Sequence, residues 1–151
     1  NYLSFITGAI DAILASQNVV LQAEEKGLGA CYLGTATYNA DKIIQILKLP
    51  KLVVPVVAIV LGYPDENPGI TERLPLDAVV HGEVYQDFDE ESINRIYAER
   101  DSSRETLELL EINQKETLAQ IFTDNRYTKE NNVLFSRKYL NVIEKQGFMN
   151  Q

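Results

Sequence analysis

Two features of the sequence combine residue types that could bind a flat or anionic ligand. The first is a glycine-rich turn, Gly27-Leu28-Gly29, followed closely by Gly34-Thr35, where the missing side chains would let backbone amides approach a ligand. The second is Arg73, which follows a loop and whose planar guanidinium suits a phosphate group. Both have simpler interpretations, because the glycines could only end a helix and turn the chain, and Arg73 could form a surface ion pair with Glu72 or Asp77.

Other catalytic chemistry finds little support. The glycine turn is expected after a helix and before a strand, which is the wrong order for a dinucleotide-binding or P-loop motif. His81 is the only histidine and Cys31 the only cysteine, so neither a zinc site nor a Cys–His nucleophile pair is expected. No serine lies in a nucleophile-elbow sequence, and solvated helix faces and loops account for the many carboxylates. No catalytic side chain and no metal ligand is therefore assigned.

Length, composition and charge narrow the class of protein. The chain has 151 residues and a mass of 17.0 kDa, with 45% apolar and 24% charged residues, which is typical of one soluble domain. Its net charge of −8 would repel phosphate backbones and anionic lipids, so no nucleic-acid or membrane partner is expected. The longest apolar run, residues 52–61, is about half the length of a membrane helix. The single cysteine fits a reducing, cytoplasmic location.

The glycine turn is expected to follow a long helix and lead into a strand. Apolar residues recur at helical spacing over residues 3–26, and Gly27 permits the left-handed conformation that ends a helix. The short apolar stretch 30–33, bounded by glycines, indicates a buried strand.

A second helix and a second strand follow. Asn39 is suited to cap a helix that ends before Pro50. Residues 52–61 are rich in Val and Ile without alternation, which predicts a central strand covered on both faces, with its paired part after Pro55.

The second half of the chain predicts mainly loops and charged helices. In chain order, these are a loop over 62–75, a weak extended segment over 78–85, a helix begun by Asp87 or Asp89, and helices over 107–122 and 134–145 separated by the polar stretch 123–132. Their sparse apolar residues could not form a core alone. We therefore expect this half to cover the first half or to embrace a second copy of the protein.

A series of short motifs occurs in a fixed order along the chain. It comprises Ala15-Ser16-Gln17-Asn18, Gly27 to Gly34, Leu47-Lys48-Leu49-Pro50, Leu61-Gly62-Tyr63-Pro64, Arg73-Leu74-Pro75, His81 and Tyr85. In order and spacing, this series resembles the flavin-dependent nitroreductase family. It looks most like the larger, NADPH-preferring nitroreductases and flavin reductases. The resemblance covers residues 1–85 and resumes at 117–148.

The resemblance implies a fold, a cofactor and a reaction. Family members are α+β proteins with a mixed sheet flanked by helices, and their C-terminal excursion wraps a homodimer partner. They bind FMN at the subunit interface and pass hydride from NADH or NADPH to the flavin and on to small-molecule acceptors such as nitroaromatics, quinones or flavins. The hard chemistry belongs to the cofactor.

Site residues follow from the same resemblance. Tyr32, Leu33, Gly34 and Thr35 match the segment whose backbone lies beside the isoalloxazine ring, and Arg73 matches the arginine that contacts the FMN phosphate. Thr71 stands where close relatives have a phosphate-binding lysine, and Gln17 and Asn18 match a helix near the dimer core. Arg100 and Arg104 are candidates for binding the 2′-phosphate of NADPH, although their neighbours in the sequence are acidic.

The resemblance also implies that the family's flavin site is incomplete here. Family chains carry about a hundred further residues before the match begins, including an Arg-Ser-x-Arg element for the phosphate. We therefore expect residues 1–151 to form a single incomplete nitroreductase-like domain, with a core part over 1–75 and a C-terminal excursion and helices over 76–151. The alternatives are a non-catalytic flavin-binding or electron-carrier module and a dimerisation module that has lost the cofactor.

Overall fold

The structure separates into two compact units. A computed structural model describes residues 1–67, 69–70 and 73–149. The first unit comprises residues 1–67 together with the C-terminal segment from residue 130, and the second comprises residues 68–129. The C-terminal helical segment thus belongs with the first unit. That all 151 residues form one incomplete domain stays a prediction.

A long helix begins the first unit, as the sequence predicts. Helix α1 (Tyr2–Glu25) starts at Asn1, whose side chain accepts a hydrogen bond from the Ser4 amide at 2.9 Å. It ends at Lys26, and Gly27 follows with a φ of +76°, the left-handed conformation expected of it. Few of its side chains are buried within the chain; those that are comprise Phe5, Val20 and Ala23.

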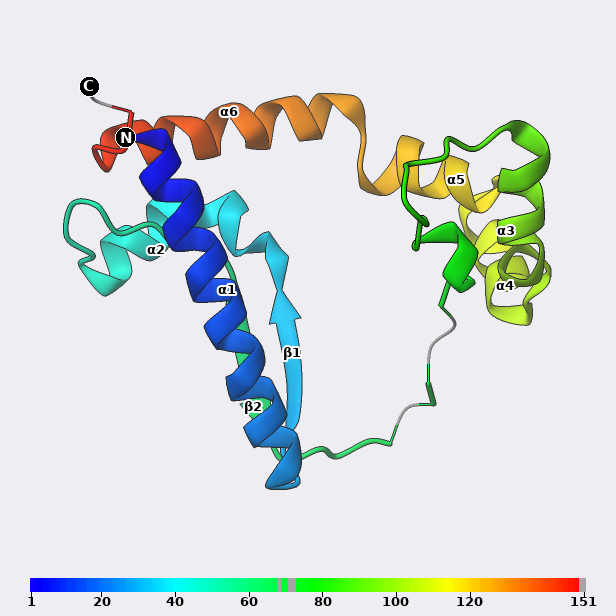
Figure 1. The fold of residues 1–151 in the computed structure, drawn as a ribbon, viewed down its shortest axis with the longest axis horizontal. Helices are drawn as coiled ribbons and strands as arrows, with labels where there is room; N and C mark the ends of the chain where they lie inside the picture. Colours follow the sequence, from blue (N-terminus) through cyan, green and yellow to red (C-terminus); the bar gives the residue numbers. More distant parts are fainter. Residues whose placement is uncertain (68, 71–72, 150–151) are drawn as a thin grey trace. The chain divides into compact units, whose positions relative to one another are not determined.

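Two strands form an antiparallel sheet that runs beside α1 (Figure 1). Strand β1 (Gly29–Leu33) pairs with β2 (Ala58–Gly62), so that Gly29 faces Gly62 and Leu33 faces Ala58. The positions of both strands agree with the sequence, but their expected burial is wrong. Val60 is 54% exposed, because the described residues supply only two strands and leave much of the sheet uncovered.

Between the strands lie two short helices. A 3₁₀ helix, η1 (Gly34–Asn39), leads directly into α2 (Ala40–Leu47). Asn39 precedes α2 as expected, although its side chain makes no capping hydrogen bond. Lys48 ends α2 in the left-handed conformation, before Pro50. The 3₁₀ helix was not predicted, since its six residues carry too little periodicity to be recognised.

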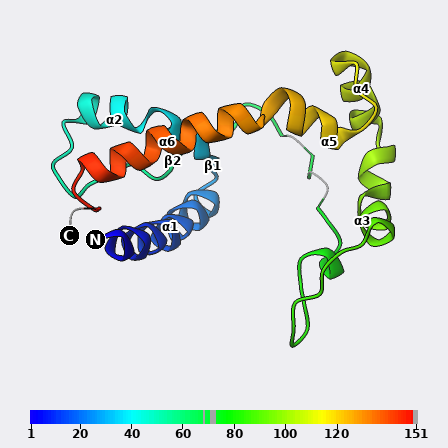
Figure 2. The same ribbon diagram turned by 90° about the horizontal axis from the view of Figure 1, so that it is seen from above.

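The C-terminal helix α6 (Lys129–Lys145) starts before the predicted residue 134 and packs on the first unit (Figures 1 and 2). The buried Gln146 amide donates hydrogen bonds to the carbonyls of Pro50 and Val53 at 3.0 and 2.6 Å. The Tyr139 hydroxyl donates to the Pro55 carbonyl at 3.0 Å. These bonds hold α6 against the chain that leads into β2.

The second unit contains helices and irregular chain. Its elements are a 3₁₀ helix η2 (Leu76–Ala78), α3 (Glu90–Ser102), α4 (Arg104–Asn113), the short α5 (Leu118–Gln120) and a π-helical turn η3 (Ile121–Arg126). Asp89 caps α3 by accepting a hydrogen bond from the Ser92 amide at 2.9 Å, which confirms one of the two expected starts. Ile96, Leu118 and Ile121 are its buried apolar residues.

Two expectations for this unit are wrong. No described residue over 78–85 is in a strand, because a 3₁₀ turn opens the segment and Glu83 adopts a φ of +60°. The single helix expected over 107–122 is broken, since Gln114 ends α4 in the left-handed conformation and Thr117 begins α5 with a capping box. A polar stretch between helices was expected over 123–132. Instead, η3 extends into its start and α6 begins before its end.

Helix α1 is long and apolar enough to cross a membrane by length and hydropathy alone. Core helices of globular domains pass the same test, so this is weak evidence. The apolar run 52–61, which is too short for a membrane helix, lies outside α1.

Candidate functional site

Tyr32, Leu33, Gly34 and Thr35 form a continuous exposed ledge in the first unit. Tyr32 and Leu33 end β1, and Gly34 and Thr35 open η1. All four residues are exposed. A Cβ added to Gly34 would meet no atom within 4 Å, so the backbone borders open space there. We refer to these four residues as the ledge.

A hydrogen-bond chain fixes the ledge against α1. The Ser16 hydroxyl donates to the Ile13 carbonyl at 2.7 Å and lies 2.8 Å from the Tyr32 hydroxyl. A serine hydroxyl has only one proton, so in this arrangement the Tyr32 hydroxyl is the donor of the second bond. The tyrosine side chain is thereby engaged with α1, while the main chain of the ledge remains accessible.

Arg73 lies in the second unit, where a second arginine accompanies it. It lines a hollow of about 220 Å³ together with Leu74, Pro75, Ile96, Glu99 and Arg100. Asp77, one of the surface partners considered for Arg73, pairs instead with Arg95 at 2.8 Å. Two guanidinium groups around one hollow suit an anionic group, although Glu99 offsets part of their charge.

The remaining candidates are placed as follows. Thr71 and Glu72 lie outside the described residues. Arg104 is 91% exposed at its side chain and pairs with Glu108 at 2.7 Å. Gln17 and Asn18 are exposed on α1.

The ledge and Arg73 belong to different units. The structure brings the four ledge residues together with one another and Arg73 together with Arg100. From the sequence, Arg100 was a candidate for the 2′-phosphate of NADPH, and its position beside Arg73 was not predicted. The helical spacing from Ile96 to Arg100 was the available signal, since residues four apart share a helix face.

The side chain of His81 has a structural setting. Its Nδ1 accepts a weak hydrogen bond from the Gln86 amide at 3.4 Å, and its ring contacts Tyr85 and Phe88, with centroids 4.7 and 5.8 Å away. Within the described chain, no group of three or more His, Cys, Asp or Glu side chains could hold a metal ion.

Shifted pKa values lie away from the ledge and from Arg73. Hydrogen bonds from Lys138, Ser92 and Lys115, respectively, are the main causes that lower the pKa of three aspartates: Asp41, Asp89 and Asp124. Burial raises the pKa of Tyr139. These shifts accompany helix caps and packing contacts and do not indicate an acid–base site.

The fold and the candidate site define an α+β protein with an exposed backbone ledge in one unit and two arginines around a hollow in the other. A family model described as the nitroreductase family matches residues 4–63. The chain is 39% identical over 90 residues to the oxygen-insensitive NADPH nitroreductase of Salmonella typhimurium, covering 60% of this chain and 38% of that protein. It is 40% identical over 81 residues to the FMN reductase (NADPH) of Bacillus subtilis, covering 54% of this chain and 32% of that protein.

The fold is similar to that of a solved protein from Bacteroides fragilis that is described as a putative oxidoreductase. The TM-score is 0.97 at 48% sequence identity, and the match covers 99% of this chain and 61% of the other. This similarity confirms the α+β, nitroreductase-like fold. The chain belongs to the nitroreductase family, and it spans less than two fifths of the length of the two curated relatives.

Proposed function

We propose that this chain is the C-terminal portion of an FMN-dependent NAD(P)H oxidoreductase of nitroreductase type. The ledge would lie beside the flavin ring, and Arg73 would bind its phosphate. Arg100 is a further candidate for the same phosphate because it lines the same hollow. Thr71 would contribute a hydroxyl in place of the family lysine.

The ledge is the observation that carries this proposal. Its four residues are exposed, its backbone borders open space at Gly34, and it lies within the stretch that matches the family model. An aromatic ring can approach accessible main chain closely where no Cβ intervenes. The relatives whose names include an NADPH-dependent reductase and an FMN reductase support the choice of ligand.

The chain's own contribution is binding and orientation. Held by the ledge and Arg73, FMN would supply the chemistry of hydride transfer between NADH or NADPH and a nitroaromatic, a quinone or a free flavin. The Ser16–Tyr32 hydrogen bond holds the ledge in place, and the arginines neutralise phosphate charge. No side chain of the described chain is assigned a proton-transfer step.

The proposal includes a homodimer in the cytoplasm. Much of α1 and of the sheet is apolar and exposed in the single chain, as expected of surfaces that pack against another chain. The net charge of −8 argues against nucleic-acid and membrane partners, and the single cysteine is compatible with a reducing compartment.

The test is an FMN titration of the purified chain followed by visible absorption and flavin fluorescence. We expect saturable binding, with Arg73→Ala weakening it about tenfold through loss of a charge-assisted bond to phosphate. Arg137→Ala, which removes an exposed arginine of α6, is the matched control and should bind as the parent does. An unchanged affinity for Arg73→Ala would refute the assigned phosphate contact.

NADH and NADPH oxidation with a nitroaromatic acceptor then separates the alternatives. Turnover supports the oxidoreductase. Retained FMN without nicotinamide oxidation would instead indicate a flavin-binding or electron-carrier module. Absence of FMN binding would indicate a dimerisation module.

A further inference from the structure

A second hollow, within the second unit, is formed by one face of α3 and by the segment around α5. Its volume is about 490 Å³, which falls within the range of small-molecule sites. Ile93, Leu118 and the ring of Phe122 contribute apolar surface, and Tyr97 adds a second aromatic ring. Leu118 is buried, so the hollow reaches the core of the unit.

Unused hydrogen-bonding groups border this apolar surface. Asn94, Tyr97 and Arg100 all line the hollow. Among the described residues, none makes a hydrogen bond or an ion pair with these three side chains. Each of the three carries N–H or O–H donors. Donor groups and aromatic side chains that line one hollow are typical of a site for a planar molecule that carries acceptor atoms.

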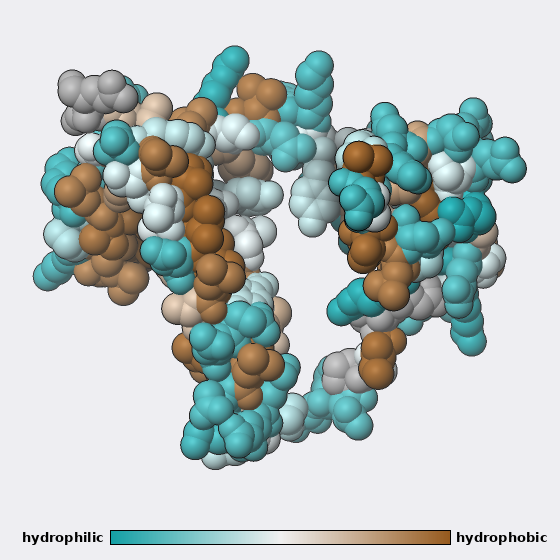
Figure 3. Space-filling view, viewed as in Figure 1, coloured by the Kyte–Doolittle hydropathy of each residue, from teal (hydrophilic) through white to brown (hydrophobic). Residues whose placement is uncertain are grey.

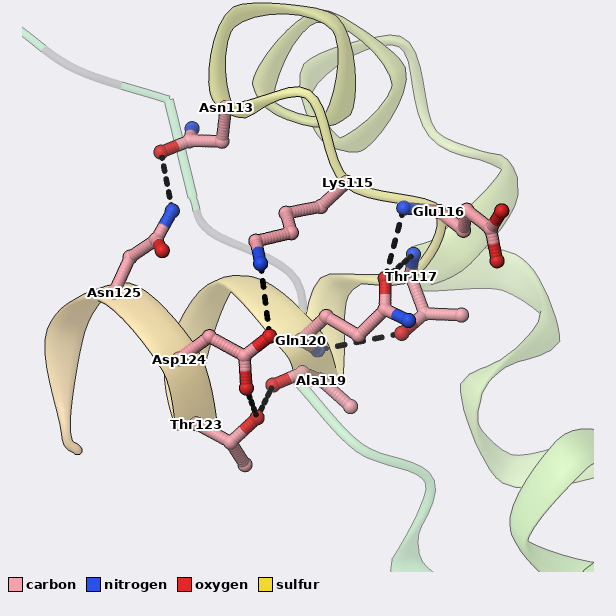
Figure 4. Close-up of polar contacts among 9 residues, drawn as sticks. All are labelled: Asn113, Lys115, Glu116, Thr117, Ala119, Gln120, Thr123, Asp124 and Asn125. Atoms are coloured by element: carbon pink, nitrogen blue, oxygen red, sulfur yellow. Dashed lines mark hydrogen bonds and ion pairs between the residues drawn. The ribbon is translucent and has the colours of Figure 1, made fainter. Parts of the chain in front are cut away.

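The wall opposite α3 is held rigidly (Figure 4). The Thr117 hydroxyl accepts from the Gln120 amide at 3.3 Å, and the Gln120 side chain accepts from the Thr117 amide at 3.2 Å. Lys115 pairs with Asp124 at 2.8 Å, and the Thr123 hydroxyl lies within hydrogen-bond distance of both the Ala119 carbonyl, at 3.0 Å, and the Asp124 carboxylate, at 2.9 Å. The wall is therefore preorganised for a ligand.

The same wall contains an unusual backbone conformation. Phe122 belongs to the π-helical turn Ile121–Arg126. π-helical turns are rare and occur frequently at functional sites. Ile121, the neighbouring residue, is fully buried, so the turn is anchored in the core while Phe122 lines the hollow.

We propose that this hollow binds a planar bicyclic aromatic molecule with oxygen acceptors on one edge. The rings lie against Phe122, and the acceptors receive hydrogen bonds from Asn94 and Tyr97. The hollow lies wholly in the second unit and contains neither the ledge residues nor Arg73; it shares Arg100 with the hollow beside Arg73, and its apolar surface is additional to the site proposed for FMN.

Coumarin is a suitable probe, because it is bicyclic, planar and bears a lactone carbonyl. We expect calorimetric titration of the full chain to show saturable binding, and amide NMR shifts to be confined to residues 93–101 and 117–122. Naphthalene has the same two-ring shape without oxygens and should bind at least about fivefold more weakly.

Variants locate the site. Tyr97→Phe and Asn94→Ala should each weaken coumarin binding about three- to tenfold, the effect of one hydrogen bond. Tyr85→Phe, an exposed tyrosine of the same unit that does not line the hollow, should have no effect. Non-saturable binding, shifts elsewhere, equal affinity for naphthalene, or unchanged binding by both Tyr97→Phe and Asn94→Ala would overturn the proposal.

Discussion

Asp89 caps a helix, and the same hydrogen bonds that form the cap lower its pKa. It begins α3, and its carboxylate accepts hydrogen bonds from the Ser92 hydroxyl and amide at 2.6 and 2.9 Å. These bonds favour the charged form and hold the pKa of Asp89 below its usual value of 3.8. The carboxylate also lies at the positive end of the helix dipole.

A pH dependence follows for Asp89. Because its pKa is lowered in the folded state, its contribution to stability is present above pH 3.8 and is lost as the pH falls through the folded-state pKa. Asp89→Ala should lower the urea midpoint of unfolding, followed by circular dichroism, and this difference should shrink between pH 7 and pH 3. Asp89→Asn should retain the cap but lose the pH dependence. A difference for Asp89→Ala that is equally large at both pH values would contradict the assigned role of the charge.

Buried polar residues of the first unit act differently from this exposed cap. Gln146 is only 6% exposed, and both of its amide protons go to backbone carbonyls that no secondary structure satisfies. The carbonyl of the same residue accepts from the Leu52 amide at 2.9 Å. A single glutamine therefore supplies the polar partners that let α6 pack on an irregular segment.

At the scale of an element, Gly27 tests the helix end that the sequence predicted. Its φ is +76°, and an added Cβ would meet no atom within 4 Å. Gly27→Ala should therefore destabilise the chain by about 1–2 kcal/mol, the cost of a left-handed residue with a side chain. The measurement is urea unfolding at pH 7.

The matched control is Gly8, which lies inside α1 and also borders open space. Gly8→Ala should stabilise the chain by about 0.5–1 kcal/mol because the helix interior favours alanine. If both substitutions changed the free energy of unfolding in the same direction, local backbone conformation would not explain their effects.

Elements with strong local signals were predictable. The glycine at the end of α1, the acidic cap of α3 and the proline after α2 each act on backbone within a few residues, so the sequence alone places them. The break between α4 and α5 was missed, because Gln114 adopts the left-handed conformation without being a glycine or an asparagine.

Properties that depend on distant chain were less predictable. The exposure of β2 depends on which other strands pair with it or cover it, and the residues of β2 alone do not determine this. Likewise, the place of Arg100 beside Arg73 depends on how α3 packs against the chain before it. The ledge residues were named from a resemblance, and their contact with a flavin stays a prediction.

At the scale of the whole molecule, the exposed apolar surface is the dominant physical feature. Several aliphatic residues of α1 are exposed, and Figure 3 shows apolar side chains gathered along this helix. They include Leu3, Ile10, Ile13, Leu14 and Leu21. Folded monomers rarely expose apolar patches of more than a few hundred Å². Such a surface favours association with another chain.

We therefore expect the purified chain to self-associate, which the mass from size-exclusion chromatography with light scattering would report. Leu14 is 65% exposed, so Leu14→Lys should shift the distribution toward monomer without unfolding the helix, because it removes apolar area from the association surface and adds a charge there. Ile112→Lys makes the same change at a 77% exposed position of α4 and should leave the mass unchanged. A monomeric parent chain at all concentrations, or equal effects of the two substitutions, would show that α1 is not the association surface, and the homodimer proposed for this protein would then need a different interface.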